Sequence, residues 1–163
     1  MPEMEIILQP NNWTCNPSAY AMCMGVSLDK VIETLGHDGS RIINVDAIRV
    51  TEVVECFDGH ELVLAAYKLG FAALEFPVML GSVIPNCDLN PHWPQMSRLW
   101  DEFPADQRFV VVIASYKYKG HFHCVAWQRD KSYYLDPHCG KIDLPFNGPV
   151  KCAIAIIRMP DVK

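Results

Sequence analysis

Apolar residues follow two different periods along the chain, and the change of period divides the chain into two parts. From about residue 15 to residue 35, and again from 62 to 69, they recur every three or four positions, which is typical of helices with one buried face, whereas residues 42–54 are ambiguous. This spacing predicts a first helix that begins at Cys15 and a second that Ser27 caps and Gly36 ends. A third helix is predicted to end at Gly70.

Beyond the helical part, apolar, β-branched and aromatic residues gather in short runs separated by turn residues, which is typical of strands. One such run follows the third predicted helix and four more lie in the last third of the chain. The predicted strands span 71–76, 108–118, 121–128, 132–135 and 151–158. A short strand is also predicted from Glu5 to Leu8. Helices followed by a meander of strands predict an α+β domain.

The middle of the chain shows neither period, and its residues 81–94 contain three prolines. Loops of such length are usually functional or mobile. A chain of 163 residues is long enough to bury one hydrophobic core. We therefore predict a single domain over residues 1–163 with an irregular loop at about 81–103.

Charge and composition exclude several classes of function. Half of the residues are apolar, a fifth are charged and the net charge is −5, with lysines and arginines scattered along the chain. A basic stripe for nucleic acid is therefore absent. The sequence contains no apolar stretch long enough to cross a membrane and no signal peptide, which predicts a cytoplasmic protein. Its seven cysteines are then expected to be reduced thiols. The oligomeric state is left open.

The candidate chemistry centres on Cys15, which lies between a polar loop and the first predicted helix. A thiol is a strong nucleophile only as a thiolate, which a helix N-terminus and a neighbouring imidazolium both favour. Far downstream, His123 is a candidate base and Asp136 a candidate for orienting it. Gln9, six residues before Cys15, is a candidate donor to the oxyanion, together with the backbone N–H of Cys15.

Two histidines compete for the role of base, because His121 and His123 alternate on one predicted strand and face the same side. If the next turn centres on Arg129 and Asp130, His123 lies directly across from Asp136. Side chains that lie directly across from each other are close, whereas diagonal ones usually are not. We therefore favour His123 as the base and keep His121 as the alternative.

Zinc binding is an alternative use of the same region, where histidines and cysteines are dense. The residues concerned are His121, His123, Cys124, His138 and Cys139. The sequence lacks a Cys-x-x-Cys pair, and strand alternation points Cys124 away from both strand histidines. We therefore predict no metal site, and the thiol chemistry requires no cofactor.

The segment from Cys15 to Met22, Cys-Asn-Pro-Ser-Ala-Tyr-Ala-Met, resembles the nucleophile helix of papain-like cysteine peptidases. The closest resemblance is to the C39-like (bacteriocin-processing) peptidases of bacteria and phages. Those carry a glutamine about six residues before the cysteine, a histidine on a strand and an Asp-Pro pair after the next strand. The matching residues here are Gln9, Cys15, His123 or His121, Asp136 and Pro137.

The resemblance spans most of the chain, includes residues 59–71 and is weakest from 81 to 103. Asn16 stands where the family often has glycine, and the strand carries two histidines where many members have one. The resemblance implies a papain-like fold whose N-terminal nucleophile helix packs on an antiparallel sheet.

It also implies hydrolysis of a peptide or amide bond in a peptide or protein substrate, through a thioester. Two other functions fit the same residues: an acyl transferase or deamidase that uses the same triad, and a binding module that has kept the fold without catalysis. The intact set of Gln, Cys, His and Asp argues against the binding module.

Overall fold

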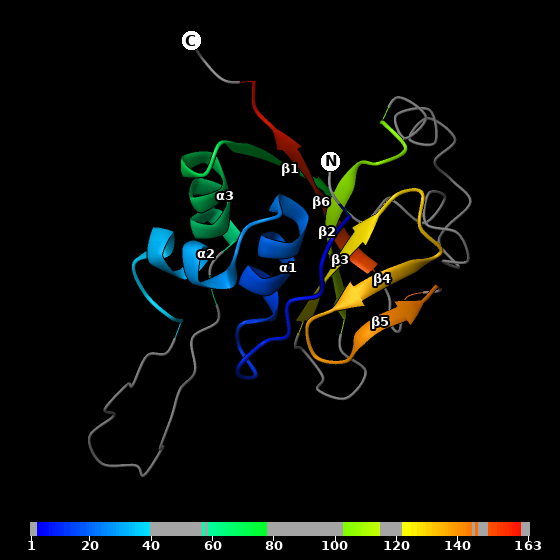
Figure 1. Ribbon diagram of the computed structural model, residues 1–163, viewed down its shortest axis with the longest axis horizontal. Coiled ribbons are helices and arrows are strands. Elements are labelled where there is room, and N and C mark those ends of the chain that lie inside the picture. The colour runs from blue at the N-terminus through cyan, green and yellow to red at the C-terminus, as the bar shows by residue number, and fades with distance from the viewer. Residues whose placement is uncertain are drawn as a thin grey trace.

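The computed structural model describes residues 3–39, 57, 59–77, 103–114, 122–144, 146 and 150–160. In this part of the chain it contains three helices and six strands (Figure 1). The helices are α1 (Cys15–Met24), α2 (Leu28–Leu35) and α3 (Gly59–Lys68). The strands are β1 (Phe71–Pro77), β2 (Arg108–Ala114), β3 (Phe122–Gln128), β4 (Tyr133–Asp136), β5 (Gly140–Asp143) and β6 (Val150–Arg158).

The three predicted helices are confirmed, and their ends depend on local chemistry. The Ser27 hydroxyl accepts a hydrogen bond from the Lys30 backbone N–H at 3.2 Å, which caps α2 as predicted. Gly36 ends the same helix with a φ of 84°, and Gly70 follows α3 with a φ of 85°. Glycine adopts these left-handed conformations at low cost, so both helices end where the sequence predicts.

The sheet is antiparallel and has the strand order β1-β6-β2-β3-β4-β5. The five predicted strands of the sheet are present within the described residues, with small differences at the ends that are described. Residues 115–118 of the strand predicted over 108–118, and residue 121 of the next, lie outside the described residues. The sequence did not predict β5, which has only four residues. The strand predicted from Glu5 to Leu8 is wrong, because that segment is irregular. Gln9, the first residue after this segment, is held by a backbone hydrogen bond in which its N–H donates to the Pro137 carbonyl at 2.8 Å.

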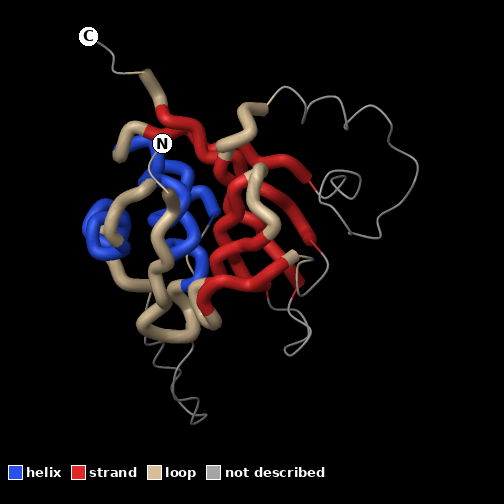
Figure 2. The backbone as a smooth tube through the Cα atoms, turned by 45° about the vertical axis from the view of Figure 1, so that its right-hand side comes forward, coloured by secondary structure: helices blue, strands red, loops and turns tan. Residues whose placement is uncertain are grey.

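The helices gather on one face of the sheet, as Figure 2 shows. Alternate residues of the strands face them, among them Val110, Cys124 and Ala126, and these join α1 in one hydrophobic cluster. The intervening residues, such as Phe109 and Trp127, form a second cluster on the other face. The fold is therefore α+β, with the helix that begins at Cys15 packed on an antiparallel sheet, as predicted.

Two predictions concern residues that the structure does not describe. The predicted loop at 81–103 lies outside the described residues except for Phe103, and the alternative base His121 lies outside them as well. Among the helices that are described, none has the length and apolar character needed to cross a membrane.

Candidate active site

The candidate residues come from the ends of three elements that meet at one edge of the fold. Cys15 is the first residue of α1, His123 is the second residue of β3 and Asp136 is the last residue of β4. The start of β3 and the end of β4 lie side by side because the two strands are antiparallel. α1 packs against β3, which brings Cys15 to the same edge.

His123 and Asp136 form a direct hydrogen bond. The Nε2 atom of His123 lies 2.9 Å from Oδ1 of Asp136, and the two side chains are 23% and 8% exposed. The same Oδ1 accepts the backbone N–H of His138 at 2.7 Å, which fixes the carboxylate. Because Nε2 is bound to Asp136, the ring nitrogen left to bond with the Cys15 thiol is Nδ1.

The strand register differs from the predicted one, although the contact forms. Ala126 pairs with Leu135 and Trp127 with Tyr134, so the same register places Asp136 across from Val125. His123 is therefore the diagonal neighbour of Asp136, not the direct one. A shift of two residues keeps both side chains on the same face. The bond spans the diagonal because both residues lie at strand ends, where Asp136 leads into the turn.

The N-terminus of α1 is a favourable place for a negative charge on Cys15. The first turn of α1 carries no acidic side chain. The Thr14 hydroxyl makes no capping bond to α1 and points instead at the Asn11 carbonyl, 3.4 Å away. The partial positive charge at this helix end is thus not neutralised by a neighbouring carboxylate of the first turn, and it favours a thiolate.

The pKa of Cys15 is lowered to about 4 by two neighbouring residues, Cys124 and His123, against the effect of burial. The largest contribution comes from hydrogen bonding to the Cys124 side chain. Burial raises the pKa, whereas the His123 ring and the Cys124 backbone N–H lower it further. Burial works against protonation of His123, but the hydrogen bonds and charges of Asp136 and Cys15 outweigh it and raise the pKa of His123 to about 9. Between these values the pair exists as thiolate and imidazolium.

Gln9 is held beside the candidate site by two bonds. Its backbone N–H donates to Pro137, next to Asp136, and its side-chain amide donates to the Asn11 carbonyl at 2.7 Å. The amide has a second N–H, which the Asn11 bond leaves available for another acceptor. Its role as an oxyanion donor stays a prediction.

Sequence reasoning missed one residue that contacts the nucleophile, Cys124. Cys15 packs against the cluster that contains Cys124, and the side chain and backbone N–H of Cys124 both help to lower the pKa of Cys15. Alternation along β3 correctly turned Cys124 away from His123, but the same alternation turns it toward α1. The signal was present in the pattern, because the residue after the strand histidine faces the helix layer.

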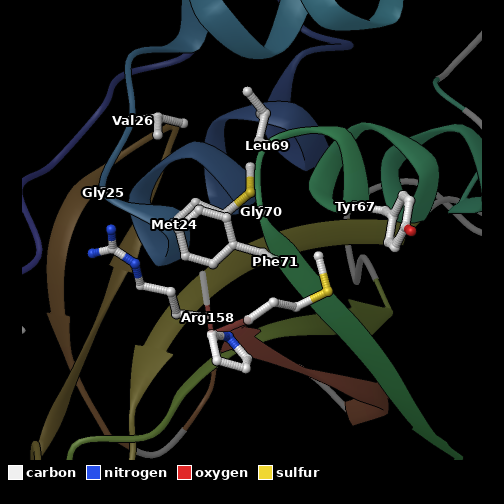
Figure 3. Close-up of a pocket in the computed structure, with 10 residues that line it drawn as sticks. Met24, Gly25, Val26, Tyr67, Leu69, Gly70, Phe71 and Arg158 are labelled. Atoms are coloured by element: carbon white, nitrogen blue, oxygen red, sulfur yellow. The ribbon is translucent and has the colours of Figure 1, made fainter. Parts of the chain in front are cut away.

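Two other features take no part in this arrangement. Within the described ranges, the structure holds no group of three metal-binding side chains. A cavity of about 510 Å³ lies at the other end of α1, beside Met24 and Gly25, and Phe71 and Arg158 also line it (Figure 3). An α-helix of ten residues is about 15 Å long, so this cavity is remote from Cys15.

Comparison with known proteins identifies the fold. No protein-family model and no curated protein matches the sequence. The structure is similar to the peptidase domain of Streptococcus ComA, a bifunctional ABC transporter involved in quorum sensing. The TM-score is 0.56 and the identity 15%, over 96% of this chain and 99% of that domain.

A second similar structure is a double-glycine motif protease from an AMS/PCAT transporter, which was solved with its leader peptide. Here the TM-score is 0.54 and the identity 15%, over 96% of this chain and 92% of the other. Both matches extend over nearly the whole chain. The protein therefore has the fold of the C39 peptidase domains, as the sequence resemblance implied.

Proposed function

We propose that this protein is a cysteine peptidase that hydrolyses a peptide or amide bond through a thioester on Cys15. The observation that carries the proposal is that Cys15, at the N-terminus of α1, lies beside His123, which in turn bonds to Asp136. These are the relations of nucleophile, base and orienting group that acyl transfer needs.

In the first half of the reaction the Cys15 thiolate attacks the carbonyl carbon of the substrate. The C–S bond forms, and the electron pair of the C=O double bond moves to oxygen. The backbone N–H of Cys15 and the second amide N–H of Gln9 donate to this oxyanion. When the oxyanion collapses, the C–N bond breaks and His123 gives its proton to the leaving amine.

In the second half water hydrolyses the thioester. His123, now neutral, takes a proton from water, and the oxygen of that water attacks the acyl carbon. The C–S bond then breaks and Cys15 leaves as a thiolate. Asp136 stabilises the imidazolium that has formed again, so the enzyme returns to its starting charge state.

A peptide substrate is proposed from the comparison as well as from the chemistry. The similar double-glycine motif protease was solved with a leader peptide. We propose that the present chain also acts on a peptide or protein segment. Peptides that contain a double-glycine motif are the first substrates to test.

Alkylation of the native protein by iodoacetamide across pH 4 to 9, mapped by mass spectrometry, tests the nucleophile. Cys15 is expected to react from about pH 5 upward. Cys139 is the internal control, because its thiol is exposed to the reagent. Partial loss of solvation and the charge of Asp136 raise the pKa of this thiol. In His123→Ala the reactivity of Cys15 should move to higher pH. Labelling of Cys15 only at the pH where Cys139 reacts would contradict the proposal.

Product analysis with the same protein tests the reaction. Two new peptide ends, absent in Cys15→Ala, are the expected result. Ammonia release or transfer of the acyl group to an amine would instead identify a deamidase or an acyl transferase. An activated Cys15 with none of these products on a broad set of peptides would favour a binding module.

A further inference from the structure

Cys124 places a second thiol in contact with the proposed nucleophile. It follows His123 on β3, is 5% exposed and lies in the same cluster against which Cys15 packs. Its side chain and its backbone N–H are among the neighbouring groups that lower the pKa of Cys15. Thiol peptidase chemistry uses one sulfur atom, so the mechanism above gives the Cys124 thiol no bond-making step.

The other described cysteines are less well placed to reach Cys15. Cys23 lies eight residues further along α1, about 12 Å along the helix axis. Cys152 is separated from Cys124 by Val112 of β2, which pairs with both, and thus lies about two strand spacings, roughly 10 Å, from it. Cys139 is exposed on the turn after β4.

The two contacting thiols differ in accessibility and therefore in chemistry. Cys15 is partly exposed at the start of α1, where the thiolate form is favoured. Cys124 is almost fully buried, so an oxidant in solution meets Cys15 first. A buried thiol next to an oxidised cysteine has the position of a resolving cysteine.

We propose that Cys15 and Cys124 form a reversible disulfide when the protein meets a peroxide. In the first step the Cys15 thiolate attacks hydrogen peroxide, the O–O bond breaks, and sulfenic acid and hydroxide are formed. In the second step the Cys124 sulfur attacks the Cys15 sulfur and expels the hydroxyl group, which leaves as water with the Cys124 proton. An external dithiol returns both residues to thiols and is itself oxidised to a disulfide.

The consequence for activity rests on the proposed function, whereas formation of the bond does not. A disulfide removes the thiolate that would attack the substrate, so hydrolysis stops. It also protects Cys15, because a sulfenic acid that remains unresolved is oxidised further to the irreversible sulfinic acid. The pair is therefore a redox switch at the candidate active site.

The test treats the full chain with hydrogen peroxide and maps the cysteines by mass spectrometry without reduction. We expect a cross-linked peptide pair that contains Cys15 and Cys124 and has lost two hydrogen atoms. Alkylation of Cys15 should be lost completely and should return after dithiothreitol. Peptide hydrolysis, where it is detected, should be lost and restored in parallel.

Cys124→Ser is the decisive variant and Cys139→Ser its matched control. In Cys124→Ser, dithiothreitol should fail to restore Cys15, which should carry sulfinic acid; Cys124→Ala repeats the test with an apolar side chain if the serine variant does not fold. Cys139→Ser should respond as the unchanged protein does. Sulfinic acid on Cys15 of the unchanged protein without the cross-link, or a cross-link to Cys139, would overturn the inference. A cross-link in a protein without peptidase activity would overturn only the proposed function.

Discussion

At the scale of single residues, Asp136 combines two effects on His123 that two substitutions separate. Its Oδ1 accepts the Nε2 proton, which orients the ring, and its charge helps to raise the pKa of His123 to about 9. Asp136→Asn keeps an acceptor oxygen but removes the charge. We expect the pKa of His123 to fall toward its ordinary value. The imidazolium is then lost at a lower pH, so the rate of hydrolysis should fall first at the alkaline end of the pH range, by roughly tenfold.

Asp136→Ala removes the acceptor as well as the charge, and a loss of about 100-fold or more is expected because the base is no longer oriented. Titration of the His123 ring protons by NMR measures the pKa without a substrate. Asp143→Asn is the control, because it removes an equal charge from an exposed position on β5. An unchanged pKa of His123 in Asp136→Asn would refute the role given to the carboxylate.

The candidate residues could be predicted from the sequence because their types are informative. A cysteine before a helix and a histidine and an aspartate on neighbouring strands suggested Cys15, His123 and Asp136, and the structure brings these three together. The detail that failed was the register of β3 and β4. A turn fixes register through its hydrogen bonds, and Arg129–Lys131 gives no glycine signal for a single turn type.

At the scale of elements, the turn between β4 and β5 controls where Asp136 lies. Gly140 pairs with Asp136 across this hairpin and has a φ of 94°. A Cβ atom there would meet nothing within 4 Å, so Gly140→Ala costs only the strained backbone, about 1–2 kcal/mol. We expect a melting temperature lower by roughly 3–6 °C and, as the turn relaxes, a lower pKa of His123.

Gly70→Ala is the matched control for this prediction. Gly70 has a φ of 85° and equally open surroundings, but it lines the cavity at the far end of α1. Thermal melting should show a similar loss of stability for both variants, with the pKa of His123 changed only in Gly140→Ala. An equal change in the pKa of His123 in both variants would mean that the overall loss of stability, and not the β4–β5 hairpin, is responsible.

Helices and strands could be predicted where the residues that define their ends lie next to them in the sequence. Ser27, Gly36 and Gly70 act on the helix ends next to them, so the ends could be read from single residues. β5 was missed because Ile142 is its one apolar aliphatic residue, and a strand of four residues has no period to detect. Its partner β4 holds it in place, and that pairing is a property of the assembled sheet.

At the scale of the whole molecule, Arg108 connects the two layers at the end of α1 that is remote from Cys15. It is 1% exposed at the start of β2, and its guanidinium donates to the Cys23 carbonyl at 3.3 Å. Carbonyl groups in the last turn of a helix lack partners within the helix, and a positive charge there is favourable. Arg108 therefore helps to fix the position of α1 on the sheet, and with it the position of Cys15.

Arg108→Gln should lower the free energy of unfolding by about 2–4 kcal/mol, because it removes a buried charged donor from the interface of helices and sheet. Arg158→Gln, at the exposed end of β6, should change it by less than about 0.5 kcal/mol. Urea unfolding measures both. Since α1 belongs to the main core, the reactivity of Cys15 at pH 5 should disappear at the same urea concentration as the fold. Loss of that reactivity well before unfolding would instead show that α1 separates from the sheet on its own.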